Sequence, residues 1–158
     1  AARVPGAWLW LMGEGDRRAE LQALADEIGI GDRTRFSGWV DEPMNYVASA
    51  SVFVMPSRHE PLGNVILEAW QANVPVVSTR SEGPSWFVRD GDDALLCDIG
   101  DDAGMADAIR RLRDNPKLGR SLAQAGRTRL AAEFTRERVV DAYMDLFQGE
   151  FRDAGADH

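Results

Sequence analysis

Short apolar runs alternate with helix-like segments through the first hundred residues, and this alternation constrains the fold more than any other feature of the chain. The run AWLWLM, residues 7–12, is continuously apolar and ends at Gly13-Glu14-Gly15, as a buried parallel strand does. From Asp16 onward the apolar residues recur at intervals of three and four, which is helical spacing. Repeated units of this kind predict a parallel sheet with crossover helices on both faces.

The predicted fold is one α/β domain with a Rossmann-like parallel sheet of about five strands, flanking helices and further helices toward the C-terminus. We assign residues 1–149 to this domain and residues 150–158 to a flexible tail, with fraying expected from Gly149. The expected strands are 7–12, 34–37, 52–55, 75–78 and 94–98. The expected helices are 16–28, 41–50, 63–72, 85–89, 102–113, 117–133 and 136–147, with Asp41 and Thr135 as N-caps.

Charge and cysteine content exclude several classes of function. The 158 residues include 26 acidic and 18 basic side chains, and no cluster of Lys and Arg interrupts the net charge of −8. We therefore expect no nucleic-acid partner. The single Cys97 excludes an internal disulfide, and no His, Cys or carboxylate cluster has metal-ligand spacing. We expect a cytoplasmic chain without a metal or other cofactor, and no apolar run is long enough to cross a bilayer.

In sheets of this kind, ligands bind beyond the carboxyl ends of the strands. The first such loop holds Gly13 and Gly15, which would allow a tight turn and close backbone approach to a phosphate. A dinucleotide fingerprint needs a third glycine where this chain has Arg18, which argues against a nicotinamide-dependent dehydrogenase. The alternative is that this pair of glycines only forms a strand-to-helix turn.

The stretch RHEPLGNVILE, residues 58–68, contains the more specific loop. A helix is expected to begin at Gly63-Asn64, directly after a buried strand and a loop that two prolines keep extended. The first amides of this helix, near Gly63, Asn64 and Val65, have no intrahelical acceptors and carry the positive end of the helix dipole. They predict an anion site that needs few basic residues.

Two carboxylates flank this helix start. Glu60 precedes it, and Glu68 lies four residues after Asn64, on the same helix face, with its side chain leaning back toward the N-terminus. Ionised carboxylates accept hydrogen bonds from vicinal hydroxyls such as those of sugars and ribose. The alternative is structural: Glu60 would favour the helix dipole, and Glu68 would be an exposed or ion-paired helix residue.

The segment HEPLGNVILEA resembles the Glu-x7-Glu signature of retaining glycosyltransferases of family 4, whose GT-B fold has two Rossmann-like domains with the active site between them. Other segments resemble the C-terminal domain of that family in the same order, and together they cover roughly residues 5–148. These segments are WLWLMGEGDRRAEL, RFSGWVDE, ASVFVMPS, PVVST, RDGDDALLCDIGD and FTRERVVDAYMDLF.

The resemblance implies roles for individual residues. Glu60 would contact hydroxyls of the donor sugar near the reacting centre, as the catalytic residue, and Glu68 would contact the ribose hydroxyls. Backbone amides of Leu62, Gly63 and Asn64 would hold the sugar and the diphosphate. The remaining donor-side candidates are Gly13, Gly15, Trp39, Val40, Arg58 and His59.

Trp39 and Val40 would lie beside the nucleobase, although packing in the core is an alternative for Trp39. Arg58 would assist a phosphate or be an exposed surface residue, and His59 is expected to make loop hydrogen bonds more than to move protons. After the strand PVVST the family has two glycines and then a Glu, whereas this chain has Glu82-Gly83-Pro84-Ser85-Trp86. We therefore give neither Glu82 nor Trp86 the role of that Glu.

The function that the resemblance implies is the donor-binding half of a transferase. It would move a sugar from a nucleotide diphospho-sugar to an acceptor hydroxyl with retention, in the synthesis of cell-surface polysaccharide or glycolipid. The alternative is a non-catalytic nucleotide-binding or interaction module. The acceptor glycan or glycolipid would bind through a missing N-terminal domain, and the whole protein would lie in the cytoplasm, peripheral to the inner face of the membrane.

The family's C-terminal domain begins with a central strand and a helix that carry an Arg and a Lys, and this chain starts after them. Their absence predicts a gap in the sheet, a domain-swapped oligomer, or a piece of a longer protein. We also expect the isolated chain to have little or no transferase activity.

Overall fold

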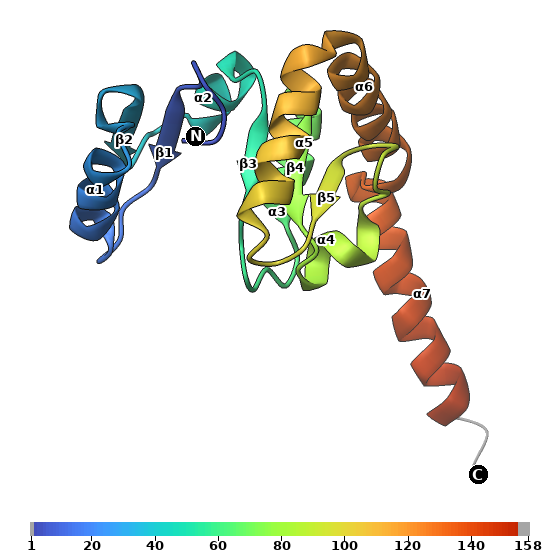
Figure 1. Ribbon diagram of the computed structural model, residues 1–158. Helices are drawn as coiled ribbons and strands as arrows, with labels where there is room; N and C mark the ends of the chain where they lie inside the picture. The colour runs from blue at the N-terminus through green and yellow to red at the C-terminus, as the bar shows by residue number, and fades with distance from the viewer. Residues whose placement is uncertain (1, 155–158) are drawn as a thin grey trace.

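The chain folds into alternating strands and helices around two parallel sheets (Figure 1). The computed structural model describes residues 2–154, and the side chains of residues 2–148. The elements are β1 (Leu9–Met12), α1 (Arg18–Glu27), η1 (Gly31–Arg33), β2 (Thr34–Gly38), α2 (Pro43–Ser49), β3 (Phe53–Met55), α3 (Asn64–Gln71), β4 (Val76–Thr79), α4 (Glu82–Phe87), β5 (Leu95–Cys97), α5 (Asp102–Asp114), α6 (Pro116–Glu133) and α7 (Arg136–Ala154).

The strands form two separate ladders. β1 pairs with β2, and β3, β4 and β5 pair in that order; every pairing is parallel. The predicted α/β class with a parallel sheet is therefore confirmed. Of the three alternatives for the absent central strand, a gap in the sheet is observed, because no ladder joins the β1–β2 sheet to β3 in the described part of the chain. Figure 1 shows β1, α1 and β2 at one side of the body that holds β3, β4 and β5.

The body is built on β4, whose four residues are all buried. Val76 belongs to a cluster with Ile66 and Trp70 of α3, whereas Val77 belongs to a second cluster with Leu112 of α5. Successive residues of a strand point to opposite faces, so helices cover this sheet on both sides. A strand covered on both faces needs apolar side chains at successive positions, as Val76 and Val77 provide here.

Trp70 is the largest fully buried side chain and connects α3 to α6. Its ring meets Phe87 and Phe134 edge to face, with centroids 5.7 and 6.3 Å apart, and its indole N–H donates to the carbonyl of Asp93 at 3.1 Å. Gly126 of α6 lies so close that a Cβ there would be 2.4 Å from the ring. Only a glycine lets α6 approach the indole this closely.

Cys97 ends β5 inside the same body. The thiol is buried and donates a weak hydrogen bond to the carbonyl of Ser78 at 3.5 Å. Burial raises the pKa of the Cys97 thiol, and the nearby carboxylates of Asp101 and Asp98 raise it further. The thiol therefore stays protonated and shielded from solvent.

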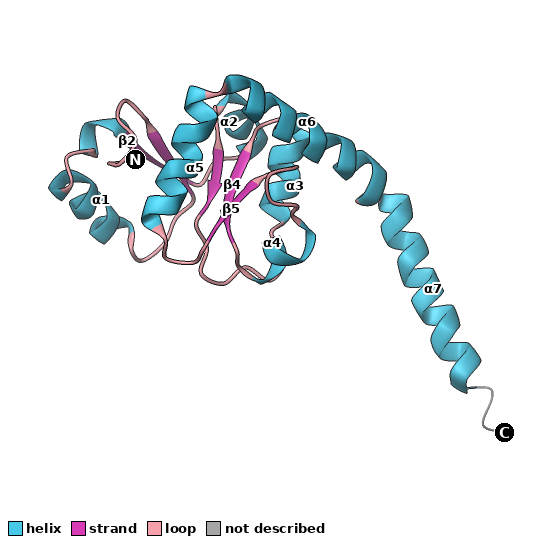
Figure 2. Cartoon of the chain, turned by 45° about the vertical axis from the view of Figure 1, so that its right-hand side comes forward, coloured by secondary structure: helices cyan, strands magenta, loops and turns pink. Residues whose placement is uncertain are grey.

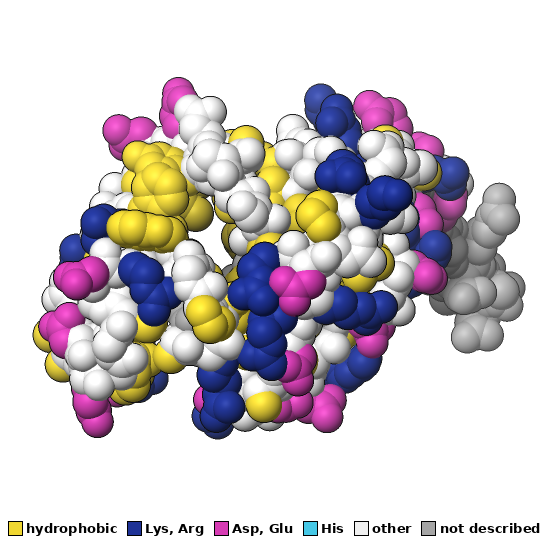
Figure 3. Space-filling model, turned by 45° about the horizontal axis from the view of Figure 1, so that its top comes forward, with side chains coloured by type: hydrophobic (Ala, Val, Ile, Leu, Met, Phe, Trp, Pro, Cys, Tyr) yellow, Lys and Arg dark blue, Asp and Glu magenta, His cyan; other side chains and the backbone are white. Residues whose placement is uncertain are grey.

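The β1–β2 unit is far less buried, so the prediction of a strand within residues 7–12 is confirmed, but the prediction that this strand is buried was wrong. Along β1, half-buried Leu9 and Leu11 alternate with exposed residues, and Trp10 and Met12 are 49% and 37% exposed. Three apolar residues of α1 and its C-terminal end are exposed as well: Leu21, Leu24 and Ile28. In Figure 3, hydrophobic side chains gather on the side of the molecule that carries this unit.

Several predicted boundaries were wrong. Asp41 does not cap α2, which begins at Pro43 with Glu42 at the N-cap position. The helix expected at 85–89 instead spans Glu82–Phe87, because a helix accepts Pro84 in its first turn. Thr135 does cap α7, its hydroxyl accepting from the amide of Arg138 at 3.3 Å.

α7 projects away from the body (Figure 2) and continues through Ala154, so the tail expected from Gly149 is helical that far. Residues 155–158 of the expected tail lie outside the described residues. Within the described part of the chain, no helix is both long enough and apolar enough to span a membrane.

Candidate functional site

The loop after β3 and the start of α3 form the predicted anion site. Gly63 stands at the N-cap with φ 80°, a left-handed conformation that glycine adopts without strain. The residue is buried, and a Cβ there would come within 3.4 Å of the Phe87 ring. The left-handed φ and the closeness of the Phe87 ring both favour glycine at the position where the loop leads into α3.

Glu60 occupies this site in the structure. Its Oε1 accepts from the amide of Gly63 at 2.9 Å and from the amide of Leu62 at 3.4 Å. A carboxylate from the same loop thus satisfies the amides of Leu62 and Gly63, while no contact to the amides of Asn64 or Val65 is found within residues 2–148. A negative charge is stabilised there by the exposed N–H groups and the dipole of α3.

Glu68 lies one turn into α3 and is half-buried. No hydrogen bond or ion pair to its carboxylate is found within residues 2–148, so the predicted ion-paired alternative is not realised there. Asn64 is exposed at the first position of the same helix. A half-buried carboxylate without a protein partner remains available to accept hydrogen bonds from a ligand.

Arg58 is exposed and lines a small cavity of about 100 Å³ beyond the carboxyl ends of β3, β4 and β5. Thr79 and Asp98 line the same cavity. Thr79 donates through its hydroxyl to the carbonyl of Ser57 at 2.5 Å, which fixes the start of the loop. The predicted loop thus lies at the sheet edge where ligands of such folds bind.

His59 contacts Glu82, a residue that we had not assigned to the site. The Nδ1 of His59 lies 3.1 Å from Glu82 Oε1, and the amide of Glu60 donates to Glu82 Oε2 at 3.1 Å. The pKa of Glu82 is lowered to about 2 by its own backbone amide, then by His59 and by the amide of Glu60. Glu82 is therefore ionised throughout the neutral range.

The glycine turn after β1 is held by contacts within the first sheet. Gly13 has φ 110° and donates to the carbonyl of Gly38 at 2.8 Å. Arg18, which replaces the third glycine of a dinucleotide fingerprint, forms an ion pair with Glu14 and donates to the carbonyl of Phe36 at 3.0 Å. Gly15 has open space around its Cα. These contacts account for the turn without a ligand.

Trp39 follows β2 and is 86% exposed, so the alternative of core packing is wrong. Val40 beside it is half-buried. An indole so exposed at the carboxyl end of a strand offers a stacking surface for a planar ligand.

The structure therefore divides the predicted residues into two groups. Arg58, His59, Glu60, Leu62, Gly63, Asn64 and Glu68 lie together on the β3–α3 segment, whereas Gly13, Gly15, Trp39 and Val40 lie on loops of the β1–β2 sheet. Within residues 2–148, no hydrogen bond or ion pair joins the groups. Glu82 was missed because its position departs from the pattern that the chain otherwise resembles. The available signal was an acidic residue two positions before Pro84, where it could lie in the first turn of a helix.

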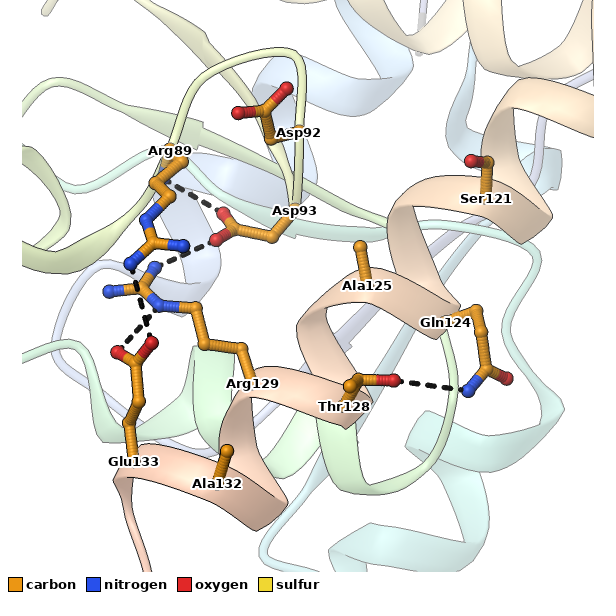
Figure 4. A pocket seen from close by; sticks show the side chains of 10 residues that line it. All are labelled: Arg89, Asp92, Asp93, Ser121, Gln124, Ala125, Thr128, Arg129, Ala132 and Glu133. Atoms are coloured by element: carbon orange, nitrogen blue, oxygen red, sulfur yellow. Dashed lines mark hydrogen bonds and ion pairs between the residues drawn. The ribbon is translucent and has the colours of Figure 1, made fainter.

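A larger cavity of about 550 Å³ lies beside α6 and the loop before β5 (Figure 4). Arg129 pairs there with buried Asp93 at 2.7 Å and with Glu133 at 2.8 Å, while Arg89 also contacts Glu133 at 3.3 Å. Although burial opposes its charge, hydrogen bonds to Asp93 and Glu133 raise the pKa of Arg129. These charges neutralise one another, so we assign this network to the attachment of α6.

No group of three or more His, Cys, Asp or Glu residues is arranged to bind a metal ion among the described residues.

Comparison with known proteins adds independent evidence. A family model described as "Glycosyl transferases group 1" matches residues 1–115. The lipopolysaccharide core biosynthesis glycosyltransferase LpsE of Rhizobium meliloti is 50% identical over 92% of this chain, which spans 43% of LpsE.

Solved structures agree in fold. Sucrose-phosphate synthase from Thermosynechococcus elongatus superposes with a TM-score of 0.85 at 31% identity, over 96% of this chain and 40% of that one. Anabaena Alr3699/HepE in complex with UDP-glucose superposes with a TM-score of 0.87 at 21% identity, over 94% of this chain and 43% of that one. The chain thus corresponds to less than half the length of each of these proteins.

Proposed function

This chain belongs to the group 1 glycosyltransferases and shares their GT-B domain fold, and on that basis we propose that it forms the donor-binding half of a retaining transferase. The donor would be a nucleotide diphospho-sugar, and the transferred group would be a hexosyl residue delivered to an acceptor hydroxyl. The name of LpsE supports a role in the synthesis of lipopolysaccharide or a related surface glycan.

The start of α3 is the observation that carries this proposal. Left-handed Gly63 stands at the N-cap, the amides of Leu62 and Gly63 share one acceptor, and Glu68 lies on the same helix without a partner within residues 2–148. A diphosphate fits the amides because they supply hydrogen-bond donors and the positive end of a dipole. Glu68 would then accept from the ribose hydroxyls.

The diphosphate would have to displace the carboxylate of Glu60, which holds the amides of Leu62 and Gly63 in the structure. Two anions cannot share those donors, so Glu60 would turn to the hydroxyls of the donor sugar when the donor binds. As the sugar leaves, negative charge develops on the diphosphate. The fixed amides and the helix dipole would stabilise it without reorganisation, with Arg58 as an additional cation.

A nucleobase would stack on Trp39, which offers an exposed aromatic surface on the first sheet. Anabaena HepE was crystallised in complex with UDP-glucose, which supports the choice of UDP and UDP-glucose as probes. We expect no metal cofactor, since the helix start supplies the stabilisation that a cation would otherwise provide. We place the protein in the cytoplasm, with an acceptor bound at the inner face of the membrane by parts of the protein outside this chain.

Titration calorimetry of the 158-residue chain with UDP and UDP-glucose tests the proposal. We expect wild type to bind, and Glu68→Ala to weaken both ligands by about tenfold, because a carboxylate that accepts from hydroxyls is removed. Glu27→Ala is the matched control, since Glu27 is an exposed carboxylate at the C-terminal end of α1, the end opposite to the Gly13–Gly15 turn. Equal affinities of wild type and Glu68→Ala would contradict the proposal that Glu68 binds the ribose hydroxyls. Binding by neither would favour a module that does not recognise nucleotides.

We also expect the isolated chain to lack transferase activity, because the acceptor side of the active site is not part of it. Rapid turnover of UDP-glucose by these 158 residues would contradict this expectation.

A further inference from the structure

Both main-chain groups of Glu60 are held by the first two residues of α4. The amide of Glu60 donates to Glu82 Oε2 at 3.1 Å, and the carbonyl of Glu60 accepts from the amide of Gly83 at 2.8 Å. The chain also comes very close here, because a Cβ on Gly83 would lie 2.5 Å from the carbonyl carbon of Leu62. The loop 59–62 therefore lies directly against the start of α4.

The Glu82 side chain joins two successive residues of that loop. One carboxylate oxygen accepts from Glu60, and the other faces His59 Nδ1 at 3.1 Å. Because the pKa of Glu82 is about 2, the carboxylate remains charged and accepts hydrogen bonds at any physiological pH. The contact joins the loop after β3 to the first residue of α4, which lies 22 positions further along the chain.

We propose that Glu82 is a positioning residue for the donor sugar: it fixes the main chain of Glu60 so that the Glu60 carboxylate can exchange the amides of α3 for sugar hydroxyls while the loop stays in place. Glu82 does not touch the donor itself. The inference rests on the proposed function and adds to it, because it makes recognition of the sugar depend on a residue outside the Glu60–Glu68 segment.

Because different groups are proposed to bind the nucleotide and the sugar, the role of Glu82 can be measured by comparing a ligand with the sugar and a ligand without it. The nucleoside diphosphate is bound by Glu68 and the α3 amides, whereas the sugar is bound through Glu60. Loss of the Glu82 side chain would leave the Glu60 main-chain amide without its acceptor, while the Gly83 amide would still hold the Glu60 carbonyl and Gly83 would still pack against Leu62. The affinity gained from the sugar would then fall, while the affinity for the nucleotide alone would stay the same.

Calorimetry with UDP and UDP-glucose on the 158-residue chain separates these contributions through the ratio of the two dissociation constants. We expect Glu82→Ala to reduce the advantage of UDP-glucose over UDP by about five- to tenfold, with the Kd of UDP unchanged within about twofold. Glu82→Gln should restore most of the advantage, because its carboxamide oxygen still accepts from Glu60. Glu27→Ala should match wild type.

Glu82→Asp provides a second variant in case Glu82→Ala does not fold. It keeps the charge but is one methylene too short to reach Glu60, so it should show the same reduced ratio.

Three results would overturn the proposed positioning role of Glu82. An unchanged ratio in a folded Glu82→Ala or Glu82→Asp variant, with normal binding by wild type, overturns the positioning role alone. Equal weakening of UDP and UDP-glucose also overturns it, because that result indicates a general structural role. Failure of wild type to bind UDP and UDP-glucose overturns the proposed function and this inference with it.

Discussion

The two sheets of this molecule differ in how much of their apolar surface is covered, although both consist of parallel strands. All four residues of β4 are buried, whereas β1 alternates half-buried and exposed positions. The exposure of two tryptophans illustrates this difference in burial. Trp70 in the β3–β5 body is 0% exposed, and Trp10 on β1 is 49% exposed. Sequence hydrophobicity alone does not separate them. The difference lies in how many elements pack against each strand.

The comparison extends to the site. The β3–β5 body holds the carboxylates and the amides at the start of α3, while the β1–β2 unit contributes an exposed indole and a glycine turn that is stabilised by its own contacts. The β3–β5 body therefore contains most of the buried apolar residues and most of the proposed ligand-binding groups. The β1–β2 unit has few buried residues, and its proposed contribution to the site is the exposed ring of Trp39.

The largest expected effect comes from truncating Trp70, with Trp10 as the comparison on the other sheet. Trp70→Ala should lower the free energy of unfolding by about 3–5 kcal/mol, because it empties a fully buried site and breaks the hydrogen bond to Asp93. Trp10→Ala should cost about 1 kcal/mol or less, since half of the ring is already in water. Urea unfolding followed by circular dichroism measures both. Similar costs for both variants would mean that β1 is as well covered in solution as α3.

A smaller effect, on binding and not on stability, is expected at Trp39. Trp39→Ala should weaken UDP binding by about 1–3 kcal/mol, because a base loses its stacking partner, and should leave the melting temperature unchanged. Trp86→Ala is the matched control, since Trp86 is 81% exposed on α4 and has no proposed ligand contact. If both variants bind UDP like wild type, the β1–β2 unit has no part in the site.

The smallest effect concerns acid stability. The folded-state pKa of Glu82 is about 2, below its ordinary value of 4.5, so its contribution is fully present above about pH 4.5 and is lost as the pH falls toward 2. Glu82→Gln should flatten the decline of stability across that window. Glu20 of α1 also has a lowered pKa, through its hydrogen bond to Arg17, but the shift is smaller and Glu20→Gln should change the decline less. Unfolding curves at about pH 5, 4, 3 and 2.5 compare the two variants.

The sequence predicted the order and type of the strands and main helices because their apolar periodicity is strong. The start of α4 was placed three residues late, at residue 85, whereas the helix includes Pro84 in its first turn and begins at Glu82. The exposure of Trp10 was also unpredictable. A continuous apolar run indicates a strand buried on both faces, but burial depends on neighbouring strands and helices that the run itself does not specify.

The site was predicted in part. The amides at the start of α3 follow from a strand, a glycine and a helix in succession, and the structure has them. The capture of those amides by Glu60 was not foreseen, because it depends on the side-chain conformation of a loop residue. The contact between Glu82 and the loop joins residues 22 positions apart, and local spacing contains no information about such a pair.

Cys97 gives the molecule an internal probe of its own opening. The thiol is buried at the end of β5 with a raised pKa, so we expect an alkylating reagent to label it slowly while β5 stays paired with β4. Because it is the single cysteine among the 158 residues, the rate of labelling reports on that pairing. The labelling rate of Cys97 should not change during a movement confined to the β1–β2 unit. It would therefore report movements of the β3–β5 body separately from those of the first sheet.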